Sequence, residues 1–152
     1  MLTTKQKSGG VFRPWRADLA FAYAAAVPPT VIVYDALTSA CVQQRDYPGT
    51  LRAFHMYAAA GMTPSVFEFS GLISLAGKAG ELEVAADALK AAVDGHACDV
   101  VVFNAFVDAC ARAGDYPRAA QAVDWMRRQA GGLFRTSTRP TLNVLLLLLA
   151  SV

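Results

Sequence analysis

The chain has few charged residues and no strong excess of either sign. Charged residues make up 17% of the 152 residues, and 14 basic side chains stand against 12 acidic ones. With 55% hydrophobic residues, this composition excludes a charged disordered tail as the main part of the chain. The net charge is also smaller than is typical of a nucleic-acid binder. Any RNA binding must therefore rely on the local placement of basic residues and on stacking.

Cysteines are few, and their spacing matches no known framework. Cys41, Cys98 and Cys110 are odd in number and include no C-x-x-C pair. A disulfide framework or a zinc knuckle is therefore not expected, and a reducing compartment is the default. Cys41 and Cys110 stand at equivalent places in a repeated pattern, where we expect small buried side chains.

Long hydrophobic runs and catalytic motifs are also missing. The apolar stretch 17–33 contains Asp18 and two prolines, and the run 145–149 is far shorter than the ~20 residues of a membrane helix. The first ten residues do not have the pattern of a secretory signal. The sequence contains no glycine-rich phosphate loop, nucleophile elbow or metal motif. We therefore expect no membrane span, cofactor, metal site or enzymatic activity.

What the chain does have is a segment that returns three times. The segment reads Val, two residues, an aromatic residue, a small polar residue, a small residue and a large apolar one. It begins at Val31, Val66 and Val100, which are 35 and 34 residues apart. Periods of about 20–50 residues are typical of solenoids and other repeat arrays.

Each repeat shows the pattern of two helices. In the first repeat, apolar and small residues recur at helical spacing from Val31 to Val42, a break follows at 44–46, and a second helical pattern begins near Pro48. Acidic residues precede each second helix and are expected to cap it: Asp46, Glu81 and Asp115. The sequence thus predicts an all-α fold, an α-solenoid of antiparallel helix pairs.

The repeats also predict how the chain is divided. We expect a disordered segment at 1–12, a degenerate partial repeat at 13–30, repeats at 31–65, 66–99 and 100–141, and a first helix of a further repeat or a cap at 142–152. The third repeat carries a loop insertion near 129–139. We favour a fragment of a longer solenoid, because terminal caps usually carry a polar outer face and the last segment is rich in leucine.

The motif resembles the pentatricopeptide repeat of the P type. The resemblance rests on the run Val100–Ala109 followed by Gly114, and on Phe54 followed by the run Gly61–Ser65. It covers about residues 30–128 and restarts at 140. It implies a right-handed superhelix, binding of single-stranded RNA along the concave groove lined by the first helices, and a location in the chloroplast or mitochondrion.

The resemblance also implies base-reading pairs, made by the fifth residue of a motif and the last residue before the next. The matching pairs are Asp35 with Ser65, Ser70 with Asp99, and Asn104 with Thr141. In the family, serine with aspartate is similar to a guanine reader, and the asparagine amide suits a pyrimidine. The first pair departs from the familiar combinations, so the first repeat is a candidate for reading nothing.

Two further sets follow from the resemblance. The second residue of each motif sandwiches a base, which gives Ile32, Phe67 and Val101. Basic residues near the end of the first helix contact phosphates, which gives Lys78 and Arg112. A solvated helix end, where a cation complements the carbonyl dipole, is the alternative for these two residues.

Two functions remain open from the sequence. The first is an organellar RNA-binding protein that holds single-stranded RNA and thereby serves its stabilisation, processing or translation. The second is a scaffold subunit of a large organellar ribonucleoprotein, such as a ribosome, that contacts other proteins or folded RNA without reading bases. The near-neutral charge and the incomplete base-reading pairs favour the second function, and the repeated motif favours the first.

Overall fold

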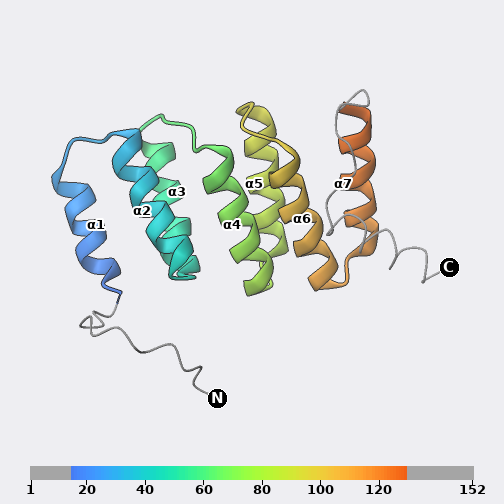
Figure 1. The fold of residues 1–152 in the computed structure, drawn as a ribbon, viewed down its shortest axis with the longest axis horizontal. Helices are drawn as coiled ribbons and strands as arrows, with labels where there is room; N and C mark the ends of the chain where they lie inside the picture. Colours follow the sequence, from blue (N-terminus) through green and yellow to red (C-terminus); the bar gives the residue numbers. More distant parts are fainter. Residues whose placement is uncertain (1–14, 130–152) are drawn as a thin grey trace, which may run out of the picture.

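The structure, a computed structural model, describes residues 15–129, which form seven helices and no strand (Figure 1). The helices are α1 (Ala17–Ala26), α2 (Val31–Gln43), α3 (Tyr47–Ala59), α4 (Val66–Ala79), α5 (Leu82–Asp94), α6 (Val100–Ala113) and α7 (Tyr116–Gln129). The segments predicted at 1–12 and 142–152 lie outside the described residues, as do Thr141 and nearly all of the predicted loop insertion.

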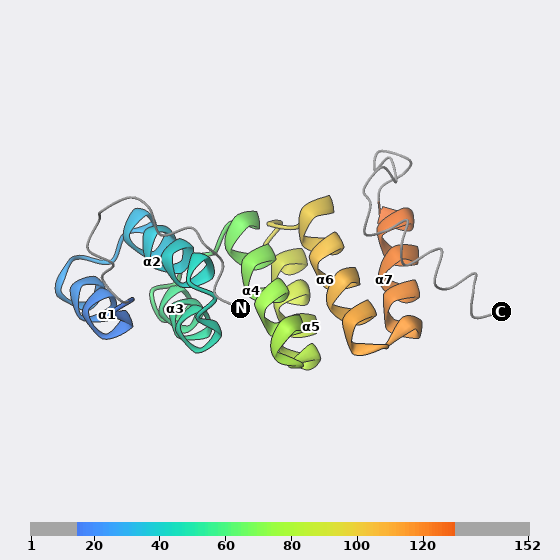
Figure 2. The same ribbon diagram turned by 60° about the horizontal axis from the view of Figure 1, so that its bottom comes forward.

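The helices are arranged as consecutive pairs. α2 packs with α3, α4 with α5, and α6 with α7, while α1 lies beside α2 (Figures 1 and 2). The first helices α2, α4 and α6 also pack against one another in chain order, so they form a continuous row. The prediction of an all-α solenoid built from helix pairs is confirmed.

The first helices end in the same kind of turn. The backbone N–H groups of Asp46, Glu81 and Asp115 donate to carbonyls five residues earlier, at 2.9, 2.9 and 3.0 Å. These bonds satisfy carbonyls that the helix end would otherwise leave unpaired, and they require a left-handed residue just before. Gly80 and Gly114 take that conformation at φ 82° and 74°, whereas the first repeat places Arg45 there, at φ 56°.

The second helices are capped less uniformly than the sequence predicts. The Asp46 carboxylate accepts from the Gly49 amide at 2.9 Å, and the Asp115 carboxylate accepts from the Arg118 amide at 3.1 Å. Glu81 precedes α5 at the equivalent place but makes no side-chain capping bond, so that expectation was wrong. Its side chain is one methylene longer than aspartate, which explains why glutamate is not among the preferred capping residues.

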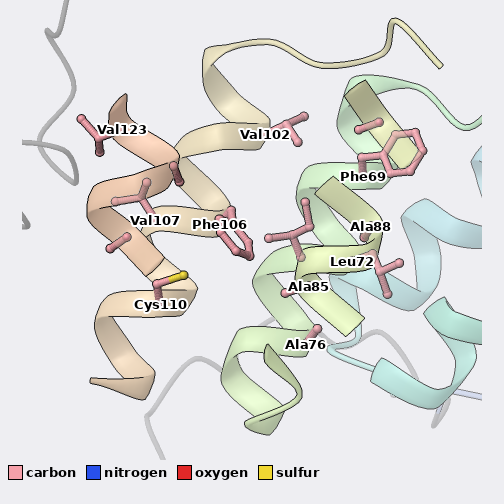
Figure 3. Close-up of a cluster of buried hydrophobic side chains, with 14 residues drawn as sticks. Phe69, Leu72, Ala76, Ala85, Ala88, Val102, Phe106, Val107, Cys110 and Val123 are labelled. Atoms are coloured by element: carbon pink, nitrogen blue, oxygen red, sulfur yellow. The ribbon is translucent and has the colours of Figure 1, made fainter. Parts of the chain in front are cut away.

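Two buried clusters form the core. The larger one joins α4, α5, α6 and α7 and contains 14 buried residues, with Phe106 of α6 directed toward the α4–α5 pair (Figure 3). The smaller one joins α1, α2 and α3 and contains five buried residues, among them Phe21 and Leu37. The expected burial of Cys41 and Cys110 is confirmed, because each is 0% exposed.

A chain of aromatic rings links the first repeat to the second. Tyr34 meets Tyr57 edge-on at 5.3 Å between ring centroids, Tyr57 lies 6.1 Å from Phe54, and Phe54 lies 5.4 Å from Phe69. Edge-on and tilted aromatic pairs add to the stability that burial alone provides. This contact places the rings of α3 between the first helices α2 and α4 and fixes the side chains that face them.

Candidate functional site

Three apolar side chains stand exposed at the same place on successive first helices. Ile32, Phe67 and Val101 are each the second residue of their helix and are 80%, 54% and 52% exposed. Their exposure contrasts with the buried aromatic residues two positions later, Tyr34, Phe69 and Phe103. Because α2, α4 and α6 lie side by side, the three side chains form an apolar row that could pack against planar rings.

A groove of about 300 Å³ runs between α2 and α4. It brings together three of the residues that the sequence singled out for different roles: Phe67, Ser70 and Lys78. The groove also contains Arg45 and Ser74, which the sequence reading missed. Within one groove, an aromatic face can stack on a base, hydroxyl groups can hydrogen-bond to its edge, and two cations can contact phosphate.

Ser70 is held by its own helix. Its hydroxyl donates to the Phe67 carbonyl oxygen at 2.9 Å, and its side chain is only partly exposed. In this rotamer, the oxygen presents lone pairs rather than a proton to the groove. Ser70 would therefore accept a hydrogen bond from a ligand N–H group, and would need a rotamer change to donate one.

Asp99 has a structural role that accounts for part of its side chain. One carboxylate oxygen, Oδ1, accepts from the amides of Val101 at 2.8 Å and Val102 at 3.2 Å, so Asp99 caps α6. Burial and the nearby Asp99 charge raise the pKa of the adjacent Cys98 thiol to about 11, which keeps it neutral near pH 7. No hydrogen bond within residues 15–129 joins Asp99 to Ser70, its expected partner.

The carboxylate of Asp35 is bound by Tyr57, which lies on the paired helix α3. The Tyr57 hydroxyl donates to Oδ1 of Asp35, and the Tyr57 side chain is 0% exposed. Burial is the largest cause that raises the pKa of Tyr57, followed by the hydrogen bond to Asp35. The phenol therefore stays protonated and remains a donor to this carboxylate.

Ser65, the other member of the first pair, is bound by Glu68. The Ser65 amide donates to Oε2 of Glu68 at 3.0 Å, and the Ser65 hydroxyl donates to the same oxygen. This is a capping interaction at the start of α4, and Glu68 is only 3% exposed. Both members of the first pair thus have partners inside the protein.

The two candidate phosphate contacts differ in their surroundings. Arg112 is bound to Asp108, with 2.9 Å between Nε and Oδ2, so part of its charge is compensated. Lys78 is exposed, lines the groove, and makes no ion pair within the described part of the chain. Asn104 is partly buried on α6, and its expected partner Thr141 lies outside that part.

Sequence reasoning missed Arg45 and Tyr57 for different reasons. Arg45 carried a signal, because it stands where the other repeats have Gly80 and Gly114 in the turn after the first helix. Tyr57 carried no such signal, because its hydroxyl partner lies 22 residues away on another helix. Only the packing of α3 against α2 reveals that contact.

A metal centre and a membrane span are two other classes of site. Among residues 15–129, no group of three or more His, Cys, Asp or Glu side chains could hold a metal ion. In the same range, no helix is long and apolar enough to cross a membrane.

A row of paired helices whose first helices lie side by side defines a helical-repeat protein. A family model described as pentatricopeptide repeat-containing protein matches residues 24–124. The chain belongs to the pentatricopeptide repeat family, whose members are generally non-enzymatic RNA-binding proteins and typically organellar. A search of curated proteins found no match.

Proposed function

We propose that this chain binds single-stranded RNA along the row of first helices, in a chloroplast or mitochondrion. The groove between α2 and α4 carries the proposal, because it joins the exposed ring of Phe67 to Ser70 and to the cations of Lys78 and Arg45. A base would stack on Phe67, the Ser70 hydroxyl and the Asp99 carboxylate would read its edge, and Lys78 would meet a phosphate.

The remaining residues take graded roles in this proposal. Ile32 and Val101 extend the apolar row to the neighbouring bases. Asn104 would read a base on the third repeat together with Thr141. Arg112 would contact a phosphate less strongly than Lys78, because Asp108 already binds its guanidinium group.

The experiment is a titration of labelled short single-stranded RNA, followed by fluorescence anisotropy at several salt concentrations. Phe67→Ala removes a stacking face and should weaken binding by about 1–3 kcal/mol. Lys78→Ala should weaken binding to all sequences and reduce the salt slope by about 0.7, as expected for one lost phosphate contact on a single strand.

Lys90→Ala serves as the matched control, since Lys90 is an exposed lysine on the second helix α5 and does not line the groove. It should leave both affinity and salt slope nearly unchanged. Equal losses from Lys78→Ala and Lys90→Ala would show that the groove is not the RNA site. Undetectable RNA binding by the native chain would reject the proposal.

A scaffold subunit of a ribonucleoprotein is the second candidate. It is favoured by the hydrogen bonds that Asp35 and Ser65 make within the protein. A scaffold does not need these two side chains to read a base. Purification from the native source separates the two functions. Stable migration with a large particle indicates the scaffold, and free exchange with short RNA indicates the reader.

A further inference from the structure

We infer that Tyr57 is a specificity-determining residue that makes the first repeat neutral to base identity, an inference that rests on the proposed RNA binding. The Tyr57 hydroxyl donates to the carboxylate of Asp35, the residue of α2 equivalent to Ser70 on α4. The bond turns Oδ1 of Asp35 toward the buried hydroxyl on α3, whereas the Asp99 carboxylate caps α6 at an exposed helix start. Tyr57 therefore acts through Asp35, as a positioning residue.

The packing of Tyr57 makes this contact persistent. The side chain is 0% exposed, and its ring is held between Tyr34 at 5.3 Å and Phe54 at 6.1 Å. A buried hydroxyl that gives up its partner loses a hydrogen bond that water cannot replace. Rotation of Asp35 toward a ligand would remove the carboxylate acceptor of the Tyr57 hydroxyl and leave it only the neighbouring Thr38 hydroxyl, which is buried on α2.

The equivalent places in the other two repeats hold no tyrosine. Tyr57 lies 26 residues after the first valine of its repeat, and the equivalent residues are Ala92 and Met126. Neither side chain can donate a hydrogen bond to the base-facing residue on its partner helix. Ser70, the residue equivalent to Asp35, instead bonds within its own helix to Phe67.

Glu68 has the same effect on the second member of the pair. It is 3% exposed and accepts from both the amide and the hydroxyl of Ser65. The equivalent residues in the first and third repeats are Val33 and Val102, which cannot accept a hydrogen bond. Tyr57 thus has no tyrosine counterpart in the other two repeats, and Glu68 has no acidic counterpart at the third position of α2 or α6.

The consequence is that the two repeats contribute differently along the row of first helices. The first repeat offers Ile32, which is 80% exposed and packs equally well against any base. The second repeat offers Phe67 together with Ser70. The first repeat would hold a nucleotide without selecting it, and selection would begin at the second repeat.

The test is the base preference of the 152-residue chain, measured by sequencing the bound fraction of a short randomised RNA pool. Ser70→Ala marks the nucleotide that faces the second repeat, and its neighbour faces the first. The native chain should show no preference at that neighbour. Tyr57→Phe keeps the ring but frees Asp35, and should create a preference of about fivefold there, the size of one hydrogen bond.

Two further variants sharpen the test. Tyr47→Phe removes a hydroxyl from the same helix, at its other end, and should reproduce the native profile. Asp35→Ala should also leave the native profile unchanged, because a silenced residue contributes no selection. This variant decides the matter even if Tyr57→Phe does not fold.

The inference is overturned if the native chain shows a base preference at the first repeat and Asp35→Ala abolishes it. It is equally overturned if Tyr57→Phe binds RNA with an unchanged profile. Both results leave RNA binding in place. A native chain that binds no RNA from the pool rejects the proposed function itself, so the two failures are distinguishable.

Discussion

Gly77 of α4 lies directly against Ala109 of α6. A Cβ atom placed on Gly77 would come within 2.4 Å of the Ala109 Cβ and 2.9 Å of its Cα. Distances below 3.0 Å to a Cα atom require the backbone to move. The absence of a side chain at Gly77 therefore sets how closely these two first helices approach.

Gly77→Ala is expected to destabilise the chain by about 1–3 kcal/mol, the usual cost of overpacking, even though alanine favours the helix by about 1 kcal/mol. Urea unfolding measures the change. Ala109→Gly on the Gly77→Ala background removes the colliding methyl group and should recover part of the loss. Additive losses in the double variant would contradict the proposed collision.

Two turns contain residues other than glycine in the left-handed conformation. Arg45 has φ 56° and His96 has φ 55°, while Gly61, Gly80 and Gly114 take similar angles elsewhere. His96→Gly and Arg45→Gly should each stabilise the chain by about 0.5–1 kcal/mol, because glycine adopts this conformation without strain. Thermal unfolding should shift upward by a few degrees, and Gly114→Ala should shift it downward.

The Asp46 carboxylate accepts two hydrogen bonds, from the Gly49 amide at 2.9 Å and from the Trp15 indole N–H at 3.0 Å. Asp46→Ala should cost about 2 kcal/mol, since it removes a helix cap and leaves the indole N–H without this acceptor. Glu81→Ala is the matched control, because Glu81 holds the equivalent place and makes no capping bond. It should change the unfolding free energy by less than about 0.5 kcal/mol. Comparable losses of stability in the two variants would show that the effect does not depend on the hydrogen bonds of Asp46.

The buried thiols predict a loss of stability at high pH. Burial is the main cause that raises the pKa of Cys41 and Cys110 to about 11, whereas an unfolded thiol ionises near pH 8.5. Between these values the folded state binds more protons than the unfolded state, so the unfolding free energy falls as pH rises. The fall should reach about 2 kcal/mol for each thiol at pH 10.

Urea unfolding at pH 7.5 and pH 10 measures this dependence. The double variant Cys41→Ala with Cys110→Ala should be less stable at pH 7.5, because it leaves cavities. It should also lose clearly less stability between the two pH values than the native chain. An equal loss in both proteins would show that the thiols are not the source.

The repeat allowed the fold to be predicted because scaffold residues recur at a fixed spacing. The places of Phe69 and Phe106 on the inner faces follow directly from helical periodicity, and both are buried. Capping was predictable where the chemistry was favourable, as at Asp46, and not at Glu81, where one methylene changes the reach of the carboxylate. Periodicity places a residue on a face but does not fix the bonds that its side chain makes.

The sequence predicted which residues lie at the candidate site, but not the hydrogen bonds that their side chains make. The sequence placed Ile32, Phe67 and Val101 in one role, and the structure exposes all three. It could not indicate that Asp35 is bound by Tyr57, because that bond depends on how closely α3 packs against α2. A side chain that is suited to reading a base can be used inside the protein when a neighbouring helix supplies a donor.

The unequal size of the two core clusters has a consequence for the order in which the chain opens. Fourteen buried residues join α4 to α7, and five join α1 to α3. In an array where each unit contacts only its neighbours, local stability follows local burial. Backbone amides of α1 should therefore exchange with deuterium well before those of α6. A ligand that spans α2 and α4 would slow exchange mainly in α1 to α3, the less stable end of the array. The two ends of the molecule therefore differ in how readily they open.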